Sequence, residues 1–135
     1  MDNVSRAQRS AVMAKVKAKH TTPELIVRRT AHALGYRFRL HRSDLPGSPD
    51  LVFVSRRKVI FVNGCFWHGH NCPRGSRKPA TNVQYWSAKI ARNVRRDREV
   101  RAKLRSLKWR ALLIWECELR DDRRLRMRLA AFLDD

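Results

Sequence analysis

The spacing of apolar residues changes along the chain, and each change predicts a different element. Thr22-Pro23-Glu24 is typical of a helix start, with a hydroxyl cap, proline at the first helical position and a carboxylate near the positive end of the helix dipole. Gly35 is suited to ending that helix, because glycine readily adopts the left-handed conformation found there. Apolar and polar residues then alternate over 36–40, which predicts a half-buried strand.

The rest of the chain continues with strands and helices. Two short apolar runs rich in β-branched residues, 51–54 and 59–62, predict a hairpin of buried strands. A long helix is expected from about 82 to 107, a buried strand at 111–115, and a helix with one apolar face at 122–133. The predicted order is helix, three strands, helix, strand and helix, which is an α/β domain.

A polar and basic segment precedes this pattern. Met13 and Val16 lie three residues apart in it, which is typical of a short helix or of an arm that becomes ordered on its ligand. No Gly/Ser linker or repeat divides the chain. We therefore expect a single domain over residues 1–135, with a basic N-terminal arm or helix at 1–20 and the core at 21–135.

The charge balance restricts the partners of this domain. The 135 residues include 31 Lys and Arg against 12 Asp and Glu, which gives a formal net charge of +19. Because 43% of the residues are hydrophobic, the chain can form a core, and a disordered basic tail is excluded. No apolar run approaches the roughly 18 residues of a membrane span, and no signal-peptide pattern opens the chain. We expect a soluble, intracellular protein that binds an anionic partner.

Cysteine and histidine residues gather at 64–72. Three cysteines without a secretory signal argue against a disulfide framework. A closed, structural zinc site needs four soft or borderline ligands. The chain offers three thiols and one imidazole for it: Cys65, His70, Cys72 and Cys117. Their spacing differs from that of common zinc fingers, so buried cysteines with unrelated histidines remain the alternative.

Two aromatic residues, Phe66 and Trp67, lie in the same segment without a helix or strand period that would bury them. Two interpretations are open. They cover the metal site, or they stack on or wedge between bases, as aromatic side chains among cations do in nucleic-acid-binding proteins.

Two acidic residues stand where a charge is costly. Asp50 directly precedes the buried run at 51–54, where a carboxylate must pair or bind a cation, unless Pro-Asp is simply a turn. Asp97 falls on or next to the inward face of the long helix, among arginines. It either forms a salt bridge with an arginine or orients a histidine or a hydrated metal ion.

These features occur in a specific combination: LPGSPDLVF, VIFVNGCFWHGHNCP, a long helix carrying Trp86, Lys89, Asn93 and Asp97, and LLIWEC. The combination closely resembles the very-short-patch repair endonucleases, from about residue 5 to beyond residue 117. The resemblance implies the restriction-endonuclease-like PD-(D/E)xK fold, with an α-β-β-β-α-β core of a mixed sheet flanked by helices, an N-terminal helical arm and a structural zinc site. It also implies an endonuclease that recognises T:G mismatches arising from 5-methylcytosine deamination and nicks 5′ of the mismatched thymine.

The resemblance implies roles for five residues of the reaction centre. Asp50 would ligate a catalytic Mg²⁺ and His68 would be the general base. Asp97 would orient His68 or engage the water shell of the metal, and Glu24 would be a supporting acid. The third strand lacks the acid and lysine of the superfamily, as it does in relatives of this repair family, so the backbone carbonyl of Val62 would be the second Mg²⁺ ligand.

The resemblance also implies residues that bind zinc and DNA. The zinc ligands are the four named above. An aromatic wedge of Phe66, Trp67 and Trp86 would enter the major groove. Its counterpart on the arm, Met13 and Val16, would enter the minor groove. Two polar residues one helical turn apart, Lys89 and Asn93, would read base edges. Relatives can carry a histidine where Asn63 stands and more histidine around Gly69, so we expect weaker or differently tuned activity, and not its absence.

The expected partners are double-stranded DNA with a T:G mismatch and downstream short-patch repair proteins. We expect a monomer in the bacterial cytoplasm, at the nucleoid, with Mg²⁺ and Zn²⁺ as cofactors and no membrane association. The alternatives are a restriction-type endonuclease that cuts matched DNA, a non-catalytic zinc-stabilised DNA-binding protein and, less favoured, a nuclease of the His-Asn-His type.

Overall fold

The computed structural model describes residues 21–66, 68–73 and 81–134. Met13 and Val16 of the predicted arm lie outside the described residues, as does Trp67 of the predicted wedge. None of the helices in the described ranges combines the length and the apolar character that a membrane span needs.

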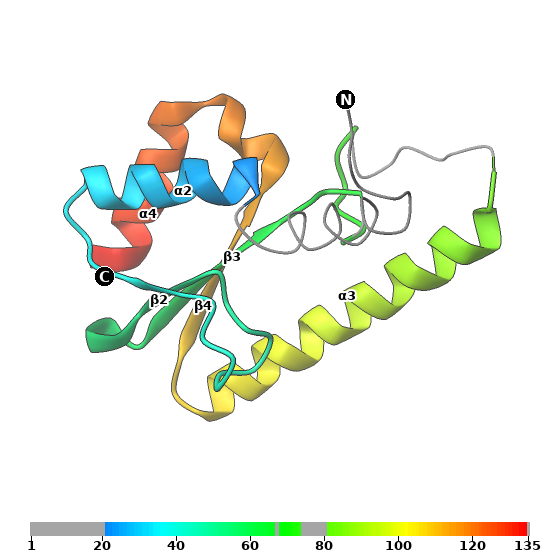
Figure 1. Cartoon of the computed structure of the whole chain (residues 1–135), viewed down its shortest axis with the longest axis horizontal. Coiled ribbons are helices and arrows are strands. Elements are labelled where there is room, and N and C mark those ends of the chain that lie inside the picture. The colour runs from blue at the N-terminus through cyan, green and yellow to red at the C-terminus, as the bar shows by residue number, and fades with distance from the viewer. Residues whose placement is uncertain (1–20, 67, 74–80, 135) are drawn as a thin grey trace, which may run out of the picture.

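In this part of the chain four strands form one mixed sheet in the order β1-β2-β3-β4 (Figure 1). They are β1 (Arg39–Leu40), β2 (Leu51–Phe53), β3 (Lys58–Asn63) and β4 (Arg110–Trp115). The first three strands pair antiparallel, and β3 and β4 pair parallel over their full length. Three α-helices accompany them: α2 (Thr22–Ala33), α3 (Val83–Ser106) and α4 (Asp122–Asp134). The observed order of helices and strands confirms the predicted one.

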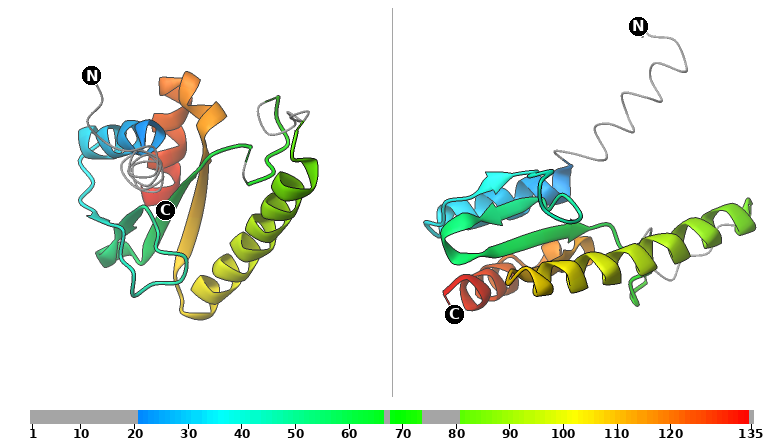
Figure 2. Two further views of the ribbon diagram at one scale, coloured as in Figure 1. Left: turned by 45° about the vertical axis from the view of Figure 1, so that its right-hand side comes forward. Right: turned by 90° about the horizontal axis from the view of Figure 1, so that it is seen from below.

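Helices cover both faces of the sheet (Figures 1 and 2). On one face, α2 and α4 pack against alternate strand residues in the buried cluster Val27, Ala31, Leu51, Phe53, Ile60, Ile114, Leu125, Leu129 and Leu133. On the other face, the C-terminal end of α3 contributes to the cluster Leu45, Val52, Val59, Leu104 and Trp109. Because successive strand residues point to opposite faces, the apolar runs in β2 and β3 supply both clusters.

Helix α2 begins with a different threonine from the one predicted. Thr21, and not Thr22, is the N-cap: its Oγ1 accepts a hydrogen bond of 3.3 Å from the backbone N–H of Glu24, and Pro23 is the second helical residue. The two threonines carry the same hydroxyl, so the sequence does not distinguish them. The observed cap places Glu24 in the third helical position, where its carboxylate turns into the protein and is 2% exposed.

The predicted strand at 36–40 is shorter than expected. Only Arg39–Leu40 pair with β2, and both residues are exposed. Tyr36 and Phe38 do point inward, with ring centroids 6.5 and 5.8 Å from that of Phe53. The alternation therefore correctly predicted that these two side chains point inward. The strand is shorter than predicted because its partner β2 has only three residues.

The turn of the predicted hairpin is also displaced. Val54, expected in the strand, starts a 3-10 turn (Val54–Arg56) and is 45% exposed. Lys58, expected in the turn, is a buried residue of β3. Its Nζ donates a hydrogen bond of 2.6 Å to the carbonyl of Phe132 near the C-terminal end of α4, where the helix dipole favours a cation. This contact joins residues far apart in the sequence, so local pattern does not reveal it.

Helix α3 extends past the sheet (Figures 1 and 2). Leu104 near its C-terminal end is buried, whereas Val83 and Tyr85 near its start are 49% and 62% exposed. The N-terminal part of α3 therefore presents its side chains away from the sheet, and its middle part borders the cleft described next.

Candidate active site

A cleft of about 1040 Å³ opens between the start of α2, the ends of β2 and β3, and the middle of α3. It is lined by the four residues predicted for acid, base or metal chemistry: Glu24, Asp50, His68 and Asp97. The sequence places these residues on four separate segments, and the fold brings them to one cavity.

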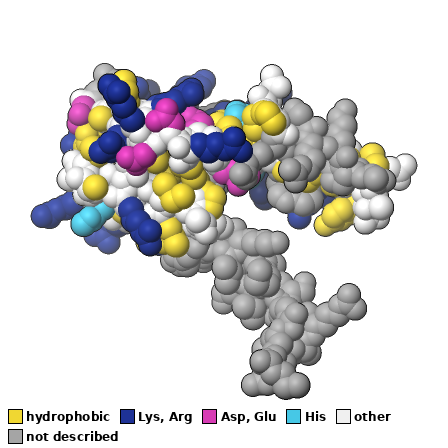
Figure 3. Space-filling view, turned by 90° about the horizontal axis from the view of Figure 1, so that it is seen from above, with side chains coloured by type: hydrophobic (Ala, Val, Ile, Leu, Met, Phe, Trp, Pro, Cys, Tyr) yellow, Lys and Arg dark blue, Asp and Glu magenta, His cyan; other side chains and the backbone are white. Residues whose placement is uncertain are grey.

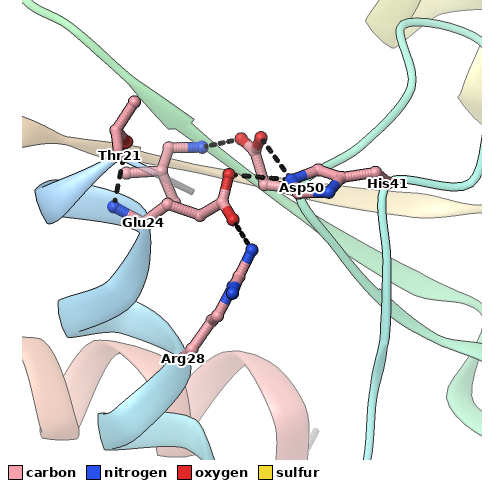
Figure 4. A network of polar contacts seen from close by, with 6 residues as sticks. Thr21, Glu24, Arg28, His41 and Asp50 are labelled. Atoms are coloured by element: carbon pink, nitrogen blue, oxygen red, sulfur yellow. Dashed lines mark hydrogen bonds and ion pairs between the residues drawn. The ribbon is translucent and has the colours of Figure 1, made fainter. Parts of the chain in front are cut away.

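Two carboxylates form one part of this cleft (Figure 4). Asp50, just before β2, accepts through Oδ2 a hydrogen bond of 2.7 Å from the backbone N–H of Val62 in β3. Glu24 is bound on both oxygens: Oε2 pairs with Arg28 one helical turn further along, and Oε1 lies 2.8 Å from Nε2 of His41. His41 Nε2 is also 4.0 Å from Asp50 Oδ1. One donor atom from each of Glu24, His41 and Asp50 lies within 4.8 Å of the others, so these residues could hold a metal ion.

Sequence reasoning missed His41. The pairing of Leu40 with Leu51 places the next residues, His41 and Asp50, opposite each other, and the His41 N–H contacts the Asp50 carbonyl at 3.4 Å. The alternation at 36–40 predicts a strand but neither its partner strand nor its register. The register with β2 would have identified His41, because it places His41 opposite Asp50.

Burial is the main cause of a raised pKa at Asp50. Burial and the neighbouring Glu24 carboxylate together bring the pKa from 3.8 to about 7, against the hydrogen bond from the Val62 N–H and the charge of His41, which lower it. A carboxylate with such a raised pKa is stabilised in its charged form by a bound cation. The arrangement therefore suits a divalent metal ion with oxygen ligands.

A histidine and an aspartate form the second part of the cleft. Nδ1 of His68 lies 2.6 Å from Oδ2 of Asp97, and their side chains are 23% and 22% exposed. Of the two interpretations of Asp97, the structure thus supports the contact with a histidine. A carboxylate on Nδ1 fixes the ring orientation and the tautomer, and directs the chemistry of the histidine to Nε2.

The four predicted zinc ligands lie together at the end of β4. Their ligand atoms, from Cys65, His70, Cys72 and Cys117, fall within 4.8 Å of one another. Cys117 Sγ and His70 Nδ1 are 3.6 Å apart. Ligands at about 2.3 and 2.0 Å from a tetrahedral zinc ion lie about 3.5 Å apart, so this spacing fits such an ion. Burial, with the neighbouring thiols, raises the pKa of Cys65 to about 12, which leaves the thiol protonated unless a metal ion binds it.

Contacts around this cluster connect it to the cleft. The ring of His70 stacks on that of Trp115 at 4.1 Å between centroids and 9° between planes, and His68 approaches the same indole edge-on at 6.3 Å. Glu116, which lines the cleft, accepts a hydrogen bond of 3.2 Å from the Cys65 N–H. The segment that carries His68 is therefore anchored on both sides to the end of β4.

Aromatic and polar residues line the protruding part of α3. The rings of Phe66 and Trp86 lie 5.7 Å apart, and Lys89 and Asn93 follow at one-turn spacing, partly buried. Gly69 allows this segment to approach α3, because its φ is +64° and a Cβ there would lie 3.0 Å from the Val94 side chain.

Figure 3 shows one face of the molecule, where Lys and Arg side chains are scattered with acidic side chains between them. Arg96 and Lys103 also line the cleft itself. The net charge of +19 attracts a polyanion to the protein, and Arg96 and Lys103 add positive charge beside the carboxylates of the cleft.

A carboxylate cluster and a His–Asp pair in one cleft of a strongly basic α/β domain are typical of enzymes that hydrolyse phosphodiesters with a divalent cation. Residues 1–74, more than half of the chain, match the family described as DNA mismatch endonuclease Vsr. The chain belongs to this family, and it is accordingly a hydrolase and an endonuclease.

Relatives match over nearly the whole chain. The protein is 50% identical to the type II nicking enzyme V.XorIIP of Xanthomonas oryzae pv. oryzae, over 98% of this chain and 97% of that protein. It is 40% identical to the DNA mismatch endonuclease Vsr of Escherichia coli, over 89% and 76% of the two chains. It is 36% identical to the type II nicking enzyme V.NmeAIP of Neisseria meningitidis, over 95% and 91%.

Proposed function

We propose that the protein is a Mg²⁺-dependent nicking endonuclease for T:G mismatches that arise from 5-methylcytosine deamination. It cuts 5′ of the mismatched thymine and so starts very-short-patch repair. The observation that carries this proposal is the pair of groups in one cleft: the Glu24–Asp50 carboxylates and the His68–Asp97 pair. In this proposal, the segment from α2 to β4 is a restriction-endonuclease-like core.

Asp50 and the backbone carbonyl of Val62 hold the Mg²⁺, with Glu24 as a supporting acid. The N–H and the carbonyl of a residue in an extended strand point to the same side. Since the Val62 N–H points to Asp50, the Val62 carbonyl points to the same side of β3. When bound there, Mg²⁺ neutralises charge on the scissile phosphate and polarises it for attack.

His68 is the general base. Asp97 holds Nδ1, so Nε2 accepts the proton of a water molecule that attacks the phosphorus in line with the leaving oxygen. The bond from phosphorus to the 3′ oxygen breaks, so the phosphate stays on the 5′ end of the nick and the leaving 3′ oxygen takes a proton from solvent. A monomer with one such cleft cuts one strand.

Aromatic residues test the base pair. Phe66 and Trp86 lie together at the protruding part of α3, and with Trp67 they form a wedge for the major groove. A mismatched step costs less to unstack than a matched one, so the wedge enters a T:G site more easily. Lys89 and Asn93 read base edges beside it. Met13 and Val16 of the arm take the minor-groove side.

The cysteine and histidine cluster holds a structural Zn²⁺. Three thiolates and one imidazole close a tetrahedral coordination sphere and leave no position for a substrate, which separates this site from the catalytic one. Downstream short-patch repair proteins then act on the nick, in the bacterial cytoplasm at the nucleoid.

Nicking of end-labelled duplexes tests the proposed function. One duplex carries T:G, and matched controls carry T:A or C:G at the same position. We expect one Mg²⁺-dependent cut, in the thymine strand on the 5′ side of the mismatch. Equal cutting of matched and mismatched duplexes would instead indicate a sequence-specific nicking enzyme, and binding without cutting would indicate a non-catalytic DNA-binding protein.

A further inference from the structure

His41 joins the two carboxylates of the cleft (Figure 4). Its Nε2 is 2.8 Å from Glu24 Oε1 and 4.0 Å from Asp50 Oδ1. The His41 side chain is 13% exposed and that of Glu24 is 2% exposed, so little water competes for this contact. An N–H donor between two nearly buried carboxylates reduces their mutual repulsion and fixes their separation.

The backbone holds His41 in an uncommon conformation. Its φ is +48°, in the left-handed region that few residues other than glycine adopt. The contact of its N–H with the Asp50 carbonyl extends the pairing of β1 and β2 by one residue and supports this conformation. Strained residues of this kind concentrate at functional sites. In Figure 4 the ring points from this position toward Glu24 and Asp50.

Glu24 has one partner on each oxygen. Arg28, on the same helix, binds Oε2, and His41, on the other side of the carboxylate, binds Oε1. Arg28 thus holds Glu24 from the side of its own helix, and His41 holds it from the side of Asp50, with which Glu24 also interacts directly.

We propose that His41 is a positioning residue of the cation site: the hydrogen bond from its Nε2 orients Glu24 toward Asp50, so that the two carboxylates act on the same ion. This inference rests on the proposed cation site at Asp50. In this role His41 acts through the N–H that its Nε2 donates to Glu24, at 2.8 Å, and not as a metal ligand, and the substitutions below separate the two roles. Loss of residues that orient metal ligands typically costs about 10–100-fold in metal affinity or activity.

Two substitutions separate positioning from ligation. His41→Gln keeps an N–H donor at about the reach of Nε2 and removes the imidazole, whereas His41→Ala removes both. The Mg²⁺ concentration for half-maximal nicking of a T:G duplex is measured at saturating DNA. The rise in unfolding temperature with Mg²⁺ is measured without DNA. His32→Ala, at an exposed position near the end of α2, is the matched control.

For His41→Ala we expect the Mg²⁺ midpoint to rise about 10–100-fold in both measurements, with the KM for DNA unchanged. His41→Gln should recover most of this loss, and His32→Ala should match the wild type. An unchanged midpoint in His41→Ala would overturn the proposal. Equal loss in His41→Gln and His41→Ala would also overturn it, because the imidazole itself would then be required. If the wild type nicks no duplex, the proposed function fails, and the thermal measurement alone decides on His41.

Discussion

At the scale of single residues, the cleft contains a carboxyl group that is costly to ionise. Burial raises the pKa of Asp50 from 3.8 to about 7. A raised pKa in the folded state means that this group stabilises the fold fully below about pH 4 and that the stabilisation is lost as the pH rises through about 7. A bound divalent cation acts in the opposite direction, because it binds the carboxylate and releases the proton.

The affinity of the cleft for Mg²⁺ should therefore depend on pH. Below about pH 7, each ion that binds must displace the Asp50 proton, so we expect the apparent affinity to fall about tenfold per pH unit. Titration of the unfolding temperature with Mg²⁺ at several pH values measures this. A midpoint that stays constant from about pH 5 to pH 8 would show that Asp50 is not the proton-releasing ligand.

His68→Ala should remove cleavage without disturbing the fold. Its ring contacts Asp97, and it is not one of the four ligands at the end of β4. Loss of a general base typically costs about 10²–10⁴-fold in rate, which single-turnover nicking measures. Zinc content and unfolding temperature should match the wild type. Loss of zinc from the variant would mean that His68 is a metal ligand and not the base.

Four residues of this cleft were predicted from the sequence. Asp50 and Asp97 were singled out as costly charges, Glu24 and His68 were added by the family resemblance, and all four line the cavity. His41 was missed because its importance comes from strand register, which a single short alternation does not specify.

At the scale of elements, the cluster of three cysteines and one histidine joins the segment after β3, which is neither helix nor strand, to the end of β4. The segment after β3 has Cys65 and His70 packed against the end of β4 through Cys117 and Trp115. The catalytic candidate His68 lies between two of these ligands. A metal ion in the cluster would thus hold the C-terminal ends of β3 and β4 together and fix the position of His68 in the cleft.

Cys117→Ser should release zinc and destabilise the domain. If the loss is about 3 kcal/mol or more, the unfolding temperature falls by about 10 °C or more in a domain of this size. Chelation of the wild type should give the same shift, and Asn71→Ser, at an exposed position of the same segment, should give none. A zinc-free Cys117→Ser protein with wild-type stability would contradict a structural site.

Elements were predicted well where their apolar pattern is long. The 24 residues of α3 and the six of β4 match the expected ranges to within one residue at each end. β1 was overestimated because pairing depends on how far its partner β2 continues. The buried Lys58 was assigned to a turn because its partner is the distant C-terminal end of α4.

At the scale of the whole molecule, the proposed function gives different roles to the net charge of +19 and to the protruding part of α3. Positive charge gives salt-dependent binding to any duplex, without sequence information. Discrimination between base pairs needs side chains that reach them, and in the proposed function the Phe66–Trp86 pair has this role.

Trp86→Ala should weaken the preference for T:G over matched DNA. Base–aromatic stacking contributes about 1–3 kcal/mol, so we expect a loss of about 5- to 150-fold in the ratio of nicking rates. Met127→Ala, which removes an exposed apolar side chain on α4, is the control. An unchanged ratio in Trp86→Ala would indicate that Trp86 serves only to pack against Phe66.

In the proposed function, the cation site at Asp50 drives cleavage and not DNA binding. The most direct test is single-turnover nicking of a T:G duplex by Asp50→Ala across a Mg²⁺ titration, with binding of the same duplex measured in parallel. We predict that cleavage is abolished at every Mg²⁺ concentration while binding stays close to that of the wild type. Wild-type nicking by Asp50→Ala at the same Mg²⁺ midpoint would contradict the claim.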